Sequence, residues 1–157
     1  MSHTPMDVRQ VEYLYRSNGA RLLDNVSEDF HRRLRDKLLT KGYPGLRLSF
    51  AAILGHMSFS GTRLIDIAEF NGMTKQAISQ IANEIESLGY IKRIPDPHDG
   101  RAKNVVFTEL GIEMIQASID AVNEVTEEYA ALIGHEKMQQ LDSILSELSD
   151  KLAPQPI

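Results

Sequence analysis

The sequence predicts a mainly α-helical protein with one small β-hairpin, and three observations support this fold class. Apolar residues recur at steps of three and four along most of the chain, as in amphipathic helices. Only two short runs, residues 90–94 and 104–108, are typical of strands, and a segment rich in turn-forming residues separates them. A length of 157 residues, 42% of them apolar, fits a single domain with one sizeable core.

The first half of the chain is expected to be helical with one clear break. Residues 7–40 carry an apolar stripe that predicts one long helix or two nearly continuous ones. A helix of that length, striped along one side, often packs against a partner outside its own domain. Gly42 and Pro44 end this segment. Residues 47–58 predict a more apolar helix at the centre of the core.

The next two predicted helices, residues 63–70 and 74–88, have the features of a helix-turn-helix. This motif needs a small residue where its helices touch, a glycine that can adopt positive φ in the turn, and apolar anchors in the second helix. Ala68 and Gly72 meet the first two needs, and Thr74 stands where the second helix requires an N-cap. The apolar anchors are Met73, Ile78 and Ile81, and Ile85 and Leu88 also face inward.

The last third of the chain predicts two further helices. Thr108 can cap a long helix that begins with Glu109 and ends at Gly134, and a last helix extends to Leu152. The acidic side chains of this region, such as Glu127, Glu128 and Asp150, are expected on solvated helix faces.

The outward face of the second helix of the motif indicates contact with DNA. Gln and Asn can pair bidentately with adenine, Lys with guanine or phosphate, and Ser with either base or phosphate groups. No acidic residue interrupts this face before Glu84. The candidate DNA-binding residues of this helix are Thr74, Lys75, Gln76, Ser79, Gln80 and Asn83. A plain solvated helix is the alternative interpretation.

The hairpin strengthens the DNA-binding interpretation. Asp99-Gly100 predicts a tight turn, and Arg101 and Lys103 follow it directly. A cation in such a loop can reach the DNA backbone or the minor groove beside a helix that lies in the major groove. Taken alone, this pattern is equally typical of an ordinary charged turn.

Charge and composition exclude several classes of function. The net charge is −5, but residues 109–157 contain ten acidic and two basic residues, whereas residues 41–108 contain six and eight. A polyanion therefore meets repulsion only near the C-terminal third, because exposed charges are largely screened beyond about 10 Å at 0.1 M salt. The absence of cysteine excludes disulfides, zinc–thiolate sites, iron–sulfur clusters and thiol redox switches.

Other patterns are missing from the sequence. It has no apolar run near the roughly 20 residues of a membrane span and no signal-peptide pattern, so a cytoplasmic protein without a membrane partner is expected. Without a catalytic motif, no enzyme activity and no cofactor are expected. The histidines are not paired at ligand spacing, so no metal site is expected, although ligands from separate helices could still meet in space. They are His3, His31, His56, His98 and His135.

Residues 61–111 resemble the winged helix-turn-helix of the multiple antibiotic resistance regulator (MarR) family. The residues that carry the resemblance are Leu88-Gly89-Tyr90-Ile91 leading into Arg93, then Asp96-Pro97, Asp99, Arg101 and Lys103 in the wing, and Thr108 with Gly111. The resemblance implies a single MarR-like domain over residues 1–157. Its DNA-binding lobe would span 47–108, and its helical dimerisation lobe would comprise 7–40 and 109–152.

The resemblance also implies a function. Its members are dimeric, sequence-specific transcriptional regulators that bind pseudo-palindromic operators in double-stranded DNA, usually as repressors released by a small molecule. Carried over, Lys75, Gln76, Ser79 and Gln80 are groove-reading positions, and Arg101 is the wing-tip residue. The family's cysteine-based peroxide sensors are excluded here.

Two questions stay open at this point. A winged-helix module that only associates with proteins is the alternative function, although Lys75, Arg101 and Lys103 favour DNA. An apolar pocket for a small apolar or phenolic effector is the second question. Its candidate lining residues are more typical of a core, and they are Tyr13, Tyr15, Phe50, Ile53, Met57 and Phe59.

Overall fold

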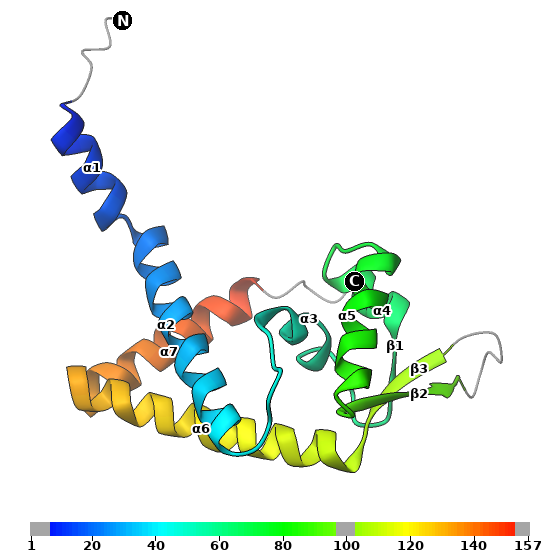
Figure 1. The fold of residues 1–157 in the computed structure, drawn as a ribbon. Helices are drawn as coiled ribbons and strands as arrows, with labels where there is room; N and C mark the ends of the chain where they lie inside the picture. Colours follow the sequence, from blue (N-terminus) through cyan, green and yellow to red (C-terminus); the bar gives the residue numbers. More distant parts are fainter. Residues whose placement is uncertain (1–6, 97–102, 153–157) are drawn as a thin grey trace, which may run out of the picture.

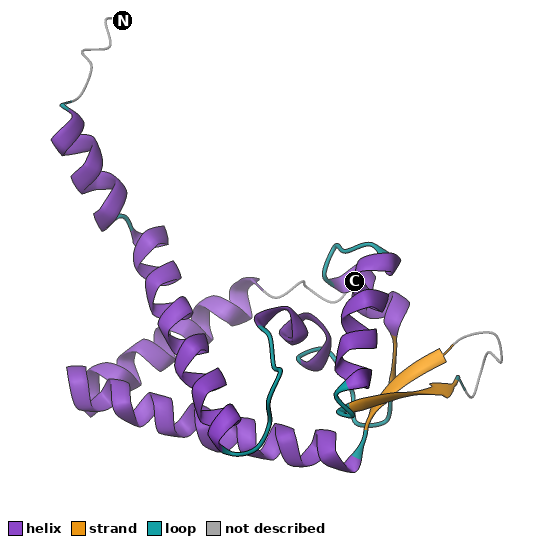
Figure 2. Cartoon of the chain, viewed as in Figure 1, coloured by secondary structure: helices purple, strands orange, loops and turns teal. Residues whose placement is uncertain are grey.

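A computed structural model describes residues 7–96 and 103–152, and it confirms a mainly helical fold with a small three-stranded sheet (Figures 1 and 2). The elements in chain order are α1 (Val8–Ser17), α2 (Gly19–Thr40), the 3-10 turn η1 (Leu48–Phe50), α3 (Ala51–Leu54), β1 (Thr62–Arg63), α4 (Leu64–Phe70), α5 (Lys75–Ser87), β2 (Ile91–Pro95), β3 (Lys103–Phe107), α6 (Glu109–Ile133) and α7 (His135–Leu152).

The first helical segment is divided into two helices at Asn18. Its side-chain oxygen accepts a hydrogen bond from the backbone N–H of Arg21 at 2.9 Å, so Asn18 caps α2 while it ends α1. The helix α1 has no buried residue and projects away from the rest of the molecule (Figure 1).

The predicted helix over residues 47–58 is confirmed only in its first part. Only η1 and α3 form there, and α3 ends at Gly55. Beyond it the hydroxyls of Ser58 and Ser60 hydrogen-bond to each other at 2.7 Å, and Thr62 accepts the backbone N–H of Ser58 at 2.8 Å. These local bonds compete with a continuing helix, and glycine is a poor helix former.

The small sheet has the strand order β1-β3-β2, with both pairings antiparallel. The hairpin strands are each shifted by one residue from their predicted positions. The strand β1 was not predicted, because two residues are too short for a detectable alternation. It occupies the start of the expected helix 63–70, so α4 begins at Leu64.

The main core lies between α3, α4, α5, the sheet and the start of α6. Its fully buried members include Phe50, Ile53, Ile67, Ile78, Ile85, Ile91, Val105 and Met114. The predicted cap of α6 is confirmed, since the Thr108 hydroxyl oxygen accepts the N–H of Gly111 at 3.0 Å. No helix within residues 7–96 and 103–152 is long and apolar enough to cross a membrane.

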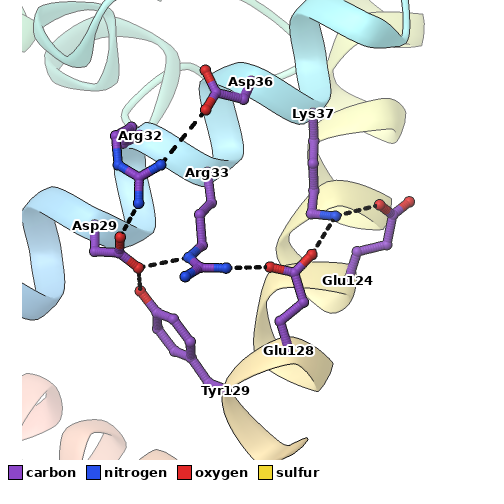
Figure 3. Close-up of polar contacts among 8 residues, drawn as sticks. All are labelled: Asp29, Arg32, Arg33, Asp36, Lys37, Glu124, Glu128 and Tyr129. Atoms are coloured by element: carbon purple, nitrogen blue, oxygen red, sulfur yellow. Dashed lines mark hydrogen bonds and ion pairs between the residues drawn. The ribbon is translucent and has the colours of Figure 1, made fainter. Parts of the chain in front are cut away.

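The helices α2 and α6 are joined by a chain of ion pairs (Figure 3). Arg33 bridges Asp29 and Glu128 at 2.6 and 2.8 Å, and Lys37 reaches Glu128 at 2.7 Å and Glu124 at 3.0 Å. Glu127 and Asp150 are exposed as predicted, whereas Glu128 is only partly exposed and belongs to this network. The network fixes α2 to the helix that leaves the sheet.

Candidate nucleic-acid interface

The helices α4 and α5 form the predicted helix-turn-helix. Ala68 is buried at their contact, and its carbonyl accepts the N–H of Met73 at 2.9 Å. Gly72 has φ +62°, the left-handed conformation that glycine adopts without strain. The Thr74 hydroxyl oxygen accepts the N–H of Ala77 at 3.2 Å and so caps α5.

The helix α5 separates an inward apolar face from an outward polar face. Its buried residues are Ile78, Ala82 and Ile85. Of the candidate DNA-binding residues on α5, Ser79 is half-buried and the others are exposed, namely Thr74, Lys75, Gln76, Gln80 and Asn83. Packing thus leaves a row of hydrogen-bonding side chains at the surface, with no acidic residue in the first turn.

Asn83 differs from the other candidates because it has a partner within the protein. The guanidinium of Arg93 on β2 donates to the Asn83 side-chain oxygen at 2.8 Å and also pairs with Glu86. The backbone N–H of Arg93 donates to Glu86 at 3.0 Å. A bidentate contact with adenine needs both the oxygen and the nitrogen of the carboxamide. Asn83 is therefore a weaker candidate for base reading than Gln80.

Arg93 joins α5 to the hairpin, and sequence reasoning missed this role. The resemblance included Arg93 as a motif residue, but helical and strand periodicity carry no signal for a contact between the two elements.

The wing is partly described. Lys103 is exposed on the first residue of β3, opposite Pro95 of β2. Arg101 lies outside the described residues. Asp96, directly after β2, is buried, and its carboxylate accepts from Arg63 Nε at 2.5 Å. Arg63 was not a sequence candidate, because β1 itself could not be predicted.

The six candidate effector-pocket residues do not line a common pocket. Phe50, Ile53 and Met57 lie in the core. Phe59 is 70% exposed against the ring of Phe107, and both tyrosines, Tyr13 and Tyr15, are exposed on α1.

A different cavity, of about 550 Å³, opens between α2 and η1. No sequence pattern indicated it, because its lining comes from one face of α2 and a residue distant in sequence. The lining residues are Asn25, Glu28, Asp29, His31, Arg32, Arg35 and Leu48.

The described histidines are separate from one another. His31 Nδ1 lies 2.7 Å from the Ser27 carbonyl oxygen, the ring of His56 packs on Phe70, and His135 lies on α7. Residues 7–96 and 103–152 contain no group of three or more His, Asp or Glu that could hold a metal ion. His3 and His98 lie outside the described residues.

Comparisons with known proteins show what this region and the whole chain are similar to. A model of the MarR family matches residues 45–102. A search of curated proteins found no match. Among solved structures, the transcriptional regulator Tm0710 from Thermotoga maritima is 25% identical with a TM-score of 0.58, and the match covers 85% of this chain and 92% of Tm0710.

Two further structures share the fold. YusO from Bacillus subtilis is 15% identical with a TM-score of 0.63, over 92% of this chain and 99% of YusO. MepR from S. aureus, solved as a complex with DNA, is 21% identical with a TM-score of 0.63, over 86% of this chain and 98% of MepR. MepR is described as a transcription regulator of a multidrug efflux pump.

Proposed function

We propose that this protein is a sequence-specific DNA-binding regulator. Residues 45–102 match the MarR family, and the chain has the fold of MarR-family transcription regulators. It acts as a homodimer on a pseudo-palindromic operator in double-stranded DNA. It represses its target promoter, in the cytoplasm where that DNA lies, until a small molecule releases it.

The observation that carries the proposal is the outward face of α5 beside the wing. Lys75, Gln76 and Gln80 are exposed at the start of a helix whose opposite side is buried in the core. Lys103 is exposed on the adjacent hairpin. A helix that presents its N-terminal residues in this way fits the major groove, and a neighbouring cation suits the backbone or the minor groove.

Exposed apolar residues support the homodimer. The helices α1 and α2 expose Val8, Val11, Leu14, Leu22, Leu23 and Val26, and α7 exposes Ile144, Leu145, Leu148 and Leu152. A second copy could cover both sets by an interface with two-fold symmetry. Such symmetry would also match an operator with two related half-sites.

The cavity between α2 and η1 supports release by a small molecule. Its lining combines residues of α2 with Leu48 of η1, and Asp29, Arg32 and Arg35 contribute charged groups to it. A phenolic molecule that can both hydrogen-bond and pack on Leu48 fits this lining better than a purely apolar one. A ligand changes DNA affinity only if it favours one spacing of the two recognition helices over another.

A binding titration tests the proposal. The full chain is titrated by fluorescence anisotropy against the promoter region of its own neighbouring genes and against a scrambled duplex of equal composition, at several salt concentrations. We expect tighter binding to the promoter duplex and a linear loss of log affinity with log salt. Equal or absent binding to both duplexes would contradict sequence-specific regulation and favour the protein-association module.

A further inference from the structure

Asp96 is a buried carboxylate at the point where the wing leaves the sheet. The residue is 5% exposed, and it is the only charged residue among residues 7–96 and 103–152 that is buried. Arg63 Nε donates to its side chain at 2.5 Å. A buried charge is stable only when paired, so this ion pair is a structural requirement of the site.

The register of the sheet explains how these two residues meet. Arg63 of β1 and Ile94 of β2 both pair with Asn104, from opposite sides of β3. Residues that face each other across strands share one face of the sheet, and Asp96 follows Ile94 by two residues, which returns to the same face. The ion pair therefore crosses β3 and joins the two outer strands.

Arg63 also connects the sheet to the helix-turn-helix. It is the last residue of β1 and the N-cap position of α4, so its backbone is continuous with the first helix of the motif. On the other side of the hairpin, Arg93 joins β2 to Asn83 and Glu86 of α5. The hairpin is thus attached to both helices of the motif.

We propose that Arg63 and Asp96 are positioning residues for DNA binding, which hold the outer end of the hairpin, including Lys103, at a fixed place relative to α5. This inference rests on the proposed function. Arg63 acts through the carboxylate of Asp96 and not by contact with DNA. If the pair is broken, the hairpin stays paired but its end is no longer fixed, and Lys103 loses most of its contribution to affinity.

The test combines a double-mutant cycle on DNA with a measurement that needs no DNA. The variants are Arg63→Gln, the neutral pair Arg63→Gln with Asp96→Asn, and Arg63→Lys, each with and without Lys103→Ala. The probe is a duplex that the unmodified protein selects from a randomised library. Arg47→Gln is the matched control, since it breaks an exposed ion pair with Glu84 in the same lobe.

We expect the neutral pair to lower DNA affinity about tenfold, which corresponds to 1.4 kcal/mol. We expect Lys103→Ala to cost about threefold to tenfold in the otherwise unmodified chain and nothing measurable once the pair is neutral. Arg63→Lys keeps the charge and should restore most of the affinity. Arg47→Gln should bind like the unmodified protein.

Amide hydrogen exchange supplies the readout without DNA. The neutral pair should raise exchange in the β1–β3 ladder, at Thr62 and Val105, by about tenfold or more, while α6 keeps its protection. The neutral pair also replaces Arg63→Gln if the single variant does not fold, because it removes the buried carboxylate charge together with the charge of Arg63.

Two results would overturn the inference. The first is an equal penalty for Lys103→Ala in both backgrounds, which is the result expected if Arg63 contacts phosphate itself. The second is unchanged exchange in the ladder. If the unmodified protein selects no duplex at all, the proposed function fails instead, and the exchange measurement alone decides whether the pair holds the hairpin.

Discussion

Gly111 lies in the first turn of α6, where the backbone passes very close to Tyr90. A Cβ atom at Gly111 would lie 1.9 Å from the Tyr90 carbonyl oxygen and 3.4 Å from the ring of Phe107. The same carbonyl accepts the N–H of Thr108 at 3.1 Å, so it is held in place on both sides. This close approach is the physical reason for a glycine at this position.

We therefore expect Gly111→Ala to lower the free energy of unfolding by about 2–4 kcal/mol, because neither backbone can move without loss of the cap. Gly19→Ala is the matched control, since nothing lies within 4 Å of a Cβ there. In the first turn of α2 it should raise the free energy by up to about 1 kcal/mol. Urea unfolding followed by circular dichroism measures both values, and similar midpoints for the two variants would refute the close-approach argument.

A second residue-scale prediction separates base reading from positioning. The exposed side chain of Gln80 has no hydrogen-bond partner among the described residues. Gln80→Ala should cost about 1–3 kcal/mol on the preferred duplex and little on scrambled DNA. Lys103→Ala, and likewise Arg101→Ala, should weaken all duplexes similarly and reduce the salt slope by up to about one per subunit.

Asn83→Ala supplies the internal comparison for this experiment. Arg93 already donates a hydrogen bond to the Asn83 side-chain oxygen. Asn83→Ala should therefore change sequence discrimination less than Gln80→Ala. The measurement is a salt titration of all variants on preferred and scrambled duplexes. If Lys103→Ala changed sequence discrimination and Gln80→Ala changed only the salt slope, the assignment of these residues to the two grooves would be wrong.

At the scale of elements, the sequence predicts those parts whose pattern extends over several turns. The stripes of α2, α5, α6 and α7 and the caps at Thr74 and Thr108 are as expected, since each depends on local spacing or a local hydrogen bond. The helix predicted over 47–58 is shorter than expected, because its apolar spacing indicates a core segment and not the length of a helix. Phe50, Ile53 and Met57 are indeed buried, but from a 3-10 turn, one short helix and a loop.

The candidate site also combines features that the sequence predicts with contacts that it does not predict. The exposed face of α5 follows from the periodicity of its buried residues. The turn-forming residues between two strand-like runs predicted the hairpin, and the resemblance identified it as a wing. The contacts of Arg63 with Asp96 and of Arg93 with Asn83 were not predictable, because they depend on how the sheet docks on the helices. Short-range patterns do not encode that docking.

The ion pairs between α2 and α6 yield a prediction about pH. Hydrogen bonds from Arg33 and Tyr129 hold the pKa of Asp29 at about 2, below its ordinary value of 3.8. Hydrogen bonds from Lys41 and Lys37 likewise lower the pKa of Glu124. A carboxylate with a depressed folded pKa stabilises the folded state above its unfolded pKa, and this stability is lost as the pH falls through the folded pKa.

We therefore expect the urea midpoint to fall between about pH 4.5 and pH 2 in the unmodified protein. Asp29→Asn should unfold at lower urea at neutral pH and show a shallower fall across that window. Asp142→Asn, at an exposed position of α7, is the control and should follow the unmodified curve. Parallel curves for Asp29→Asn and the unmodified protein would show that the network contributes no pH-dependent stability.

At the scale of the whole molecule, α1 is the helix that the described part of the chain, residues 7–96 and 103–152, leaves without a buried residue. It has ten residues. Isolated helices shorter than about 12–15 residues are marginal in water, and their stability in proteins comes from packing of an apolar face. Val8, Val11 and Leu14 form such a face, and they are 78%, 47% and 48% exposed. In the proposed function, a second copy of the chain covers this face, because an operator with two half-sites calls for a two-fold dimer.

Glutamate on these exposed faces should therefore separate the two copies while each chain keeps its fold. Leu14→Glu on α1 and Leu148→Glu on α7 change side chains that are each 48% exposed, so they remove little packing within one chain. Leu39→Glu, at a 60% exposed position of α2 outside both faces, is the control.

By sedimentation equilibrium, the unmodified protein and the control should have twice the chain mass of 17.6 kDa, and the two variants should approach the single mass. A monomer places one recognition helix instead of two that lie about 34–36 Å apart, so its affinity for a two-half-site duplex should fall at least tenfold. A monomeric variant that binds that duplex as tightly as the unmodified protein would mean that one chain carries the whole recognition surface.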